Sequence, residues 1–327
     1  MLNCLLAGLQ DYTTDERGDV GSWIRMVCIK GLTDVAIVLL NNGAHIPALP
    51  DYFPPSKFHD AIGGTLKQGV ERLDNVRQHA GQQILRLLEF QVPDFPGNGQ
   101  WLIHGDALMR QLFLSGEEIS GWHEGSWLFP KAVRLLEIPE YRQKLLSGFV
   151  LSVNSRTDST QRPVSTSLVN YAKSLPTEET AGISYSLPHL AEDLVAQCSR
   201  NLGSNAVVIP VLQTFNILLE GDAFESIYED PAKCQSLKAM YSIAARNVSK
   251  INNVQRIGAC MRILINMLPI PELRPQCIQK LSEFLAHRYP KIRADAAEYL
   301  YLILQTKDLG YDTEEAEDVI LETEWYC

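Results

Sequence analysis

The sequence lacks the features of an exported or membrane-spanning protein. It opens with MLNCLLAGLQ, which has neither a basic n-region nor a small-residue cleavage site, so no signal peptide is expected. No uninterrupted apolar run reaches the roughly 18 residues that a spanning helix needs. The seven cysteines are odd in number, scattered and mostly set in apolar segments, which favours reduced thiols over a disulfide framework. These absences predict a cytoplasmic protein without a membrane span.

Basic charge is scarce as well. The chain has 29 Lys and Arg against 39 Asp and Glu, a formal net charge of -10. Eight of the acids lie between Asp308 and Glu324, where no Lys or Arg occurs. Because no basic stripe is available to neutralise phosphates, nucleic acid is not expected as a partner. The acidic segment is either a solvated helix face or tail, or a contact for a basic patch on a partner.

Motifs of catalysis and metal binding are also missing. GGTLKQG (63–69) does not place its lysine and hydroxyl as a P-loop does, and no G-x-S-x-G elbow occurs. The histidines show no H-x-x-x-H spacing, and no C-x-x-C pair begins a zinc site. Residues 11–22 start like a calcium loop, but Glu16 replaces the glycine of the turn and Ser22 replaces the bidentate glutamate. We therefore expect no catalytic residue, cofactor or metal, and an enzyme is the weakest interpretation.

Helical periodicity, by contrast, is present nearly throughout. In WIRMVCIKGLTDVAIVLL, VRQHAGQQILRLLEF and IRADAAEYLYLIL, apolar residues recur at spacings of three and four, which places them on one stripe of a helix. Proline-, glycine- and serine-rich breakers separate such runs. We predict an all-α protein with helical repeats over 1–153, a loop at 154–163, further repeats over 164–307, and an acidic helix or tail at 308–327.

Three arginines reveal a repeat. Counted from Arg25, Arg77 and Arg293, the residue three later is small, and those seven and eleven later are apolar. The preceding residue is Ile or Val each time, which gives the pattern [VI]-R-x-x-small-x-x-x-aliphatic. A degenerate fourth copy is expected at 252–268, with Val254 and Gln255 in place of the Val-Arg pair. This recurrence predicts a HEAT/armadillo-like α-solenoid of paired antiparallel helices, which contacts partners along an extended face.

The segment DYTTDERGDVGSWIR (11–25) is the first candidate for partner contact. Its Arg-Gly-Asp triplet would suit an integrin ligand only in an extracellular protein. Asp19 or Ser22 can cap a helix that begins near Gly21. The stretch before it is expected to form the turn between two helices, where Arg17 pairs with a neighbouring acid or reaches a partner. The candidate residues here are Asp11, Tyr12, Asp15, Arg17, Asp19 and Trp23.

A second candidate is the block 121–153, GWHEGSWLFPKAVRLLEIPEYRQKLLSGFVLSV. Pro139 is expected to open a helix there. Large aromatic residues and Arg are typical of interface hot spots, although they also pack in cores. Trp122 and Trp127, which lie beside glycines, are the expected exceptions to core packing, and Arg142 joins them as a candidate.

Four blocks of the sequence resemble a known family. LLAGLQDYTTDERGDVGSWIR, FPKAVRLLEIPEYRQKLLSGFVLSV, AHRYPKIRADAAEYLYLIL and ILETEW together are similar to the C-terminal region of the tubulin-folding cofactor D family, in the same order. The resemblance implies a non-enzymatic assembly factor of the cytoplasm and the microtubule cytoskeleton. It implies β-tubulin, cofactors C and E and a small ARF-like GTPase as partners, and a contribution to stimulated GTP hydrolysis on tubulin within a complex.

Other interpretations remain open. Family members are several times longer, so the chain would correspond to their C-terminal part and could lack independent activity. A generic HEAT scaffold would show no preference for tubulin. Alternatively, the chain itself supplies an arginine finger to a GTPase, with Arg17 or Arg142 as the candidate, and such an arginine must be exposed and unpaired.

Overall fold

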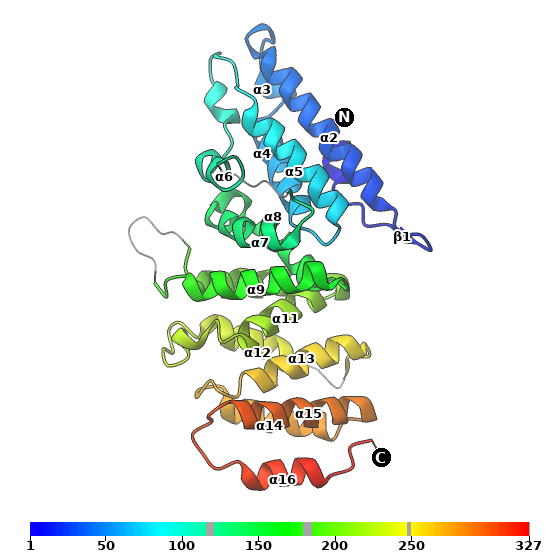
Figure 1. Ribbon diagram of the computed structural model, residues 1–327, viewed down its shortest axis with the longest axis vertical. Helices are drawn as coiled ribbons and strands as arrows, with labels where there is room; N and C mark the ends of the chain where they lie inside the picture. The colour runs from blue at the N-terminus through cyan, green and yellow to red at the C-terminus, as the bar shows by residue number, and fades with distance from the viewer. Residues whose placement is uncertain (116–120, 179–184, 247–249, 327) are drawn as a thin grey trace. The chain divides into compact units, whose positions relative to one another are not determined.

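The computed structural model describes residues 1–115, 121–178, 185–246 and 250–326. Helices account for nearly all of its regular structure, as the periodicity predicts, and the chain divides into two compact units, Met1–Ser167 and Leu168–Cys327 (Figure 1). The first unit contains α1 Leu2–Gly8, β1 Thr14–Asp15, β2 Gly18–Asp19, α2 Gly21–Asn41, α3 Leu49–Tyr52, α4 Pro55–Gly69, α5 Asp74–Glu89, α6 Asp106–Phe113, α7 Gly125–Ala132 and α8 Pro139–Val153. The division falls within α9 Asp158–Ser174, and the second unit continues with α10 Leu187–Arg200, α11 Asn205–Glu220, α12 Gln235–Ala245, α13 Val254–Asn266, α14 Arg274–Leu285, α15 Pro290–Thr306 and α16 Glu314–Glu322.

Helix α4 lies at the centre of the first unit and packs against α1, α2, α5 and α8. Two glycines, Gly69 on α4 and Gly81 on α5, leave a slot for the indole of Trp122, which is only 2% exposed. A Cβ on Gly69 would come within 2.6 Å of Trp122 Cζ3, and one on Gly81 would lie closer than 3.0 Å to the same indole. The absence of two side chains thus allows the largest residue type into the core.

The second unit consists of successive helix pairs (Figure 1). Helices α11, α13 and α15 pack on one another in turn, and each also packs against the helix that precedes it, α10, α12 or α14. Their contact faces are aliphatic, and side chains of α13 such as Ile257 and Ile263 are completely buried. This confirms the predicted solenoid of paired helices, in which each repeat buries its apolar face against its neighbour.

Arginines near helix starts hold the loops that precede them. Arg77, Arg142 and Arg293 each occupy the fourth position of their helix, where the guanidinium reaches back along the chain. Each donates to the backbone carbonyl six residues earlier, and Arg274 at the start of α14 does the same. The pairs are Arg77 Nη1 to Glu71 O (2.9 Å), Arg142 Nε to Leu136 O (2.7 Å), Arg274 Nε to Leu268 O (2.8 Å) and Arg293 Nη1 to His287 O (2.8 Å). Each of these loop carbonyls thereby accepts a hydrogen bond from a charged donor.

The fourth arginine repeat has a different register from the predicted one. Val254 and Gln255, the predicted equivalents of the Val-Arg pair, are both exposed. Arg256 is the structural counterpart, because the residues three, seven and eleven positions after it are buried: Ala259, Ile263 and Met267. Arg256 Nη1 donates to Leu202 O at 2.9 Å. The predicted register is wrong because a glutamine, not an aliphatic residue, precedes this arginine.

The predicted loop at 154–163 is wrong for most of its length. Helix α9 begins at Asp158, whose carboxylate favours the positive end of the helix. Thr160 is 3% exposed and starts a stripe that Val164 and Leu168 continue at spacings of four. The stretch looked like a loop because it is polar, but a buried threonine fills a core position there.

Candidate partner-binding surface

The segment between α1 and α2 is a tight hairpin rather than an irregular turn. Thr14 pairs with Asp19 and Asp15 with Gly18 in a two-stranded antiparallel ladder. Gly18 has φ +105°, a value that side-chain-bearing residues rarely adopt. Asp15 Oδ1 accepts a hydrogen bond from the Arg17 amide at 2.8 Å, and Asp15 Oδ2 accepts one from Arg17 Nη2 at 2.6 Å. The predicted turn, its left-handed glycine and the pairing of Arg17 with a neighbouring acid are therefore confirmed.

A buried ion pair fixes this hairpin to α2. Arg25 is completely buried, and its Nη1 and Nη2 donate to the two carboxylate oxygens of Asp19 at 3.0 Å each. Arg25 also donates to Asp11 O at 2.5 Å and to Gln68 Oε1 at 2.9 Å. Asp19 Oδ1 in turn accepts from the Ser22 amide at 3.1 Å and so caps α2, as predicted. One arginine thus joins the hairpin, α2 and α4.

Electrostatics around Asp19 favour its charged form. Burial raises the pKa of this carboxyl, but the hydrogen bonds and positive charges of Arg25 and Arg72 outweigh burial and hold the pKa below its usual range. Arg72 Nη2 lies 3.2 Å from Asp19 Oδ2, and its side chain is 39% exposed. Asp19 is therefore a negatively charged bridge between a fully buried cation and a partly solvated one.

A second polar cluster lies beneath Tyr12. The Tyr12 hydroxyl donates to Glu71 Oε1, and Gln68 Nε2 donates to the same hydroxyl at 3.0 Å. Lys67 Nζ lies 3.7 Å from Glu71 Oε1, and the side chains are 10% and 1% exposed. Burial raises the pKa of Glu71 and lowers that of Lys67. The polar atoms of Tyr12 and Asp19, which we expected to contact a partner, are instead used inside the protein.

The hairpin exposes the polar residues 13–18, and beside them the first turns of α2 expose apolar and aromatic side chains. Trp23 is 57% exposed, Ile24 47% and Val27 69%, and they lie at consecutive and i+4 positions of α2. The Arg17 guanidinium stacks over the Trp23 ring, 5.6 Å from its centroid, and the Arg17 side chain is 64% exposed. We call Arg17, Trp23, Ile24 and Val27 the hairpin–α2 surface. Exposed aromatic and arginine residues on a rigid support are typical of interface hot spots.

Trp122 is not part of any such surface, and the prediction that it is an exposed anchor is wrong. Its indole packs against Phe113 at a tilt of 37°, with 4.6 Å between ring centroids, in the glycine slot described above. Its backbone carbonyl accepts a hydrogen bond from Arg77 Nε at 3.3 Å. No sequence signal beside the tryptophan itself reveals this, because the slot is formed by α4 and α5.

Trp127 and Arg142 lie on α7 and α8, away from the hairpin in sequence, and both are half-buried. Lys131 Nζ lies 4.0 Å from the centroid of the Trp127 ring, on the same helix. Arg142 holds the Leu136 carbonyl, which assigns it a structural task and disfavours it as an arginine finger. Arg17 is exposed as a finger requires, but its guanidinium is paired with Asp15.

Two other kinds of feature are absent from the described residues. No group of three or more His, Cys, Asp or Glu side chains there is arranged to hold a metal ion. Within the same ranges, none of the helices combines the length and apolar character needed to cross a bilayer.

The sequence matches a known family. The profile described as "Tubulin folding cofactor D C terminal" matches residues 59–256, which is more than half of the chain. The chain belongs to the tubulin-folding cofactor D C-terminal family. A relative in this family, "Tubulin-specific chaperone D" of Dictyostelium discoideum, is 24% identical over 161 residues. That match covers 46% of this chain and 11% of the Dictyostelium protein, so the chain spans a small part of the length of its relative.

The cofactor D match begins within α4 and ends within α13. It includes Gln68 and Glu71, which support the hairpin, as well as the Trp122 slot. The hairpin–α2 surface itself precedes the matched residues, and α15 and α16 follow them. The family match therefore covers part of the support of the hairpin, and neither the Arg25–Asp19 pair nor the exposed tryptophan.

Proposed function

We propose that this chain is a non-enzymatic tubulin-assembly factor that binds β-tubulin through the hairpin–α2 surface. The observation that carries the proposal is the cofactor D profile over residues 59–256. In this proposal the chain acts after the chaperonin in assembling or dismantling the αβ-tubulin heterodimer, together with cofactors C and E and a small ARF-like GTPase. It contributes to GTP hydrolysis on tubulin by positioning its partners, and it works in the cytoplasm at the microtubule cytoskeleton.

The choice of surface rests on rigidity and exposure. Trp23 offers a large apolar side chain with few torsions to order on binding, and Arg17 adds a charged group beside it. Both are supported by the buried Arg25–Asp19 pair, so the loop does not have to fold when a partner arrives. A pre-ordered surface loses less conformational entropy on association, which increases affinity for a given contact area.

The test is binding of the purified chain to αβ-tubulin, with and without the GTP-bound ARF-like GTPase. We expect Trp23→Ala to weaken binding by about 30-fold, which corresponds to roughly 2 kcal/mol for a hot-spot residue. Tyr52→Ala is the matched control, because Tyr52 is a 70% exposed aromatic residue on another helix. Tubulin binding that survives both Trp23→Ala and Arg17→Ala would contradict the assignment of the surface. A folded native chain that binds neither tubulin nor the GTPase would contradict the function.

A further inference from the structure

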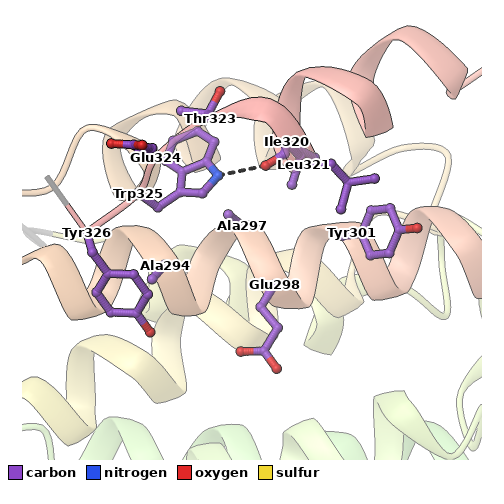
Figure 2. Close-up of a pocket in the computed structure, with 10 residues that line it drawn as sticks. All are labelled: Ala294, Ala297, Glu298, Tyr301, Ile320, Leu321, Thr323, Glu324, Trp325 and Tyr326. Carbon is purple, nitrogen blue, oxygen red and sulfur yellow. Dashed lines mark hydrogen bonds between the residues drawn. The ribbon is translucent and has the colours of Figure 1, made fainter.

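The second unit carries a groove that the proposed function does not use. It lies between α15 and residues 320–326, has a volume of about 510 Å³, and is lined along α15 by Ala294, Ala297, Glu298 and Tyr301. These four residues follow the i, i+3, i+4, i+7 spacing of a single helix face. In Figure 2, Tyr326 and Tyr301 lie toward opposite ends of this face, with Glu298 between them and the Trp325 indole next to Ala297.

The wall of the groove opposite α15 is held in place by hydrogen bonds. Trp325 Nε1 donates to Ile320 O at 2.8 Å, as Figure 2 shows, and Thr323 Oγ1 donates to Val319 O at 2.6 Å. Both acceptors are carbonyls of the last turns of α16, which an isolated helix end would leave without partners. Arg293 Nε donates to Trp325 O at 3.2 Å and so ties this segment to α15. The indole is therefore fixed through its backbone and its ring, and the groove is pre-formed.

The groove has apolar and aromatic walls and an acidic rim. Leu321 is 62% exposed and Tyr326 73%, so two large side chains remain in solvent at its edge. Glu298 and Glu324 line it, and among the described residues no lysine or arginine does. The nearby segment from Asp308 to Glu324 carries eight acids without a single basic residue. A basic ligand would bring the complementary charge to this rim, whereas an acidic one would be repelled.

We propose that this groove binds a cationic amphipathic helix of a partner protein. Ala294 and Ala297, which are 8% and 3% exposed, form the floor of the groove, and one aliphatic side chain of the ligand would lie above them beside the Trp325 indole. Lysine or arginine residues on its flanks would pair with Glu298 and contact the faces of Tyr301 and Tyr326. The specificity follows from the charge of the rim, since the apolar floor alone does not distinguish basic from acidic helices.

Fluorescence anisotropy with a labelled synthetic peptide tests this. The probe is a peptide of about 18 residues built from leucine and lysine at helical spacing, and two matched peptides replace lysine by glutamate or leucine by serine. Of the three peptides, we expect only the Leu/Lys peptide to bind, with an affinity that falls as salt is added. Glu298→Lys and Leu321→Ser should each weaken binding by about fivefold or more.

Glu192→Lys on α10 is the matched charge control, because Glu192 is an exposed acid of the same unit outside the groove. The proposal is overturned if Glu298→Lys and Leu321→Ser leave the peptide affinity unchanged. It is also overturned if Glu192→Lys weakens peptide binding equally, because the attraction would then be non-specific and due to the acidic protein as a whole. Concentration-dependent self-association abolished by Leu321→Ser, without peptide binding, would make a second copy the occupant and overturn it too. Trp23→Ala should leave peptide binding intact, so failure here is separable from failure of tubulin binding.

Discussion

Replacing Asp19 by asparagine isolates the charge of the buried pair that holds the hairpin. Asparagine has nearly the same shape and keeps an acceptor for the Ser22 amide, so the cap of α2 survives. Arg25, however, remains completely buried and loses its bidentate carboxylate partner. Its other hydrogen bonds, to Asp11 O and Gln68 Oε1, satisfy donors without neutralising the charge.

The expected loss in the free energy of unfolding of the first unit is about 3 kcal/mol. Removing one member of a buried ion pair typically costs about 3–5 kcal/mol, because an uncompensated charge stays in the interior. We expect the lower end of this range, because Arg72, the second cation that contacts Asp19, is 39% exposed and can be solvated when the carboxylate is removed. Buried Glu71 also interacts with Arg25, but its ion-pair partner is Lys67, so it replaces Asp19 as counter-charge only in part.

Native-state hydrogen exchange is the appropriate assay, because a chain with two compact units need not unfold in one two-state transition and exchange reports the stability of each region. Amides of α2 and α4 in the Asp19→Asn chain should exchange more rapidly, with a change that corresponds to the predicted loss. Asp15→Asn removes the exposed pair with Arg17 and should change stability by less than about 0.5 kcal/mol. A loss below about 1 kcal/mol for Asp19→Asn, or equal losses for both variants, would refute this reasoning.

Two further predictions concern pH and packing. The pKa of Asp19 is lowered in the folded chain, so its contribution to the free energy of unfolding is complete above its unfolded pKa of about 3.9 and is lost as pH falls through the folded value. The difference in stability between the native and Asp19→Asn chains should therefore close on acidification. A difference that widens in urea titrations at decreasing pH would contradict this. Gly81→Ala should destabilise the chain by about 1–3 kcal/mol in thermal unfolding, because the new Cβ overlaps the Trp122 indole. Gly203→Ala, whose added Cβ would meet no atom within 4 Å, is the control and should stay within about 0.5 kcal/mol.

Sequence periodicity was sufficient for the strongly amphipathic helices, and turn chemistry for the local part of the candidate site. Spacings of three and four report directly which side of a helix is buried, and they correctly placed Leu32 and Ile84 in the core. The pairing of Arg17 with Asp15 and the left-handed Gly18 were also accessible, because turn chemistry acts over two or three residues.

Contacts between distant segments were not accessible in this way. Tyr12 and Glu71 are 59 residues apart, and nothing around Tyr12 indicates that its hydroxyl points inward. Trp122 appeared exposed because glycines flank it, but the glycines that matter are Gly69 and Gly81, on other helices. Polarity misled at Thr160 as well, since a hydroxyl-bearing side chain can fill a core position. Trp23 was a candidate from the sequence, but its exposed apolar neighbours Ile24 and Val27 were identified only in the structure.

The arginines that reach back six residues have a consequence for how this fold tolerates changes in length. Because Arg142 donates a hydrogen bond to the Leu136 carbonyl, the connection between the two residues must keep its length. One extra residue could carry that carbonyl up to about 3.3 Å further away, beyond hydrogen-bond reach. Insertions during evolution or engineering should therefore accumulate in connections that no such arginine spans. The four connections closed by an arginine–carbonyl hydrogen bond should keep their length even where their sequence changes.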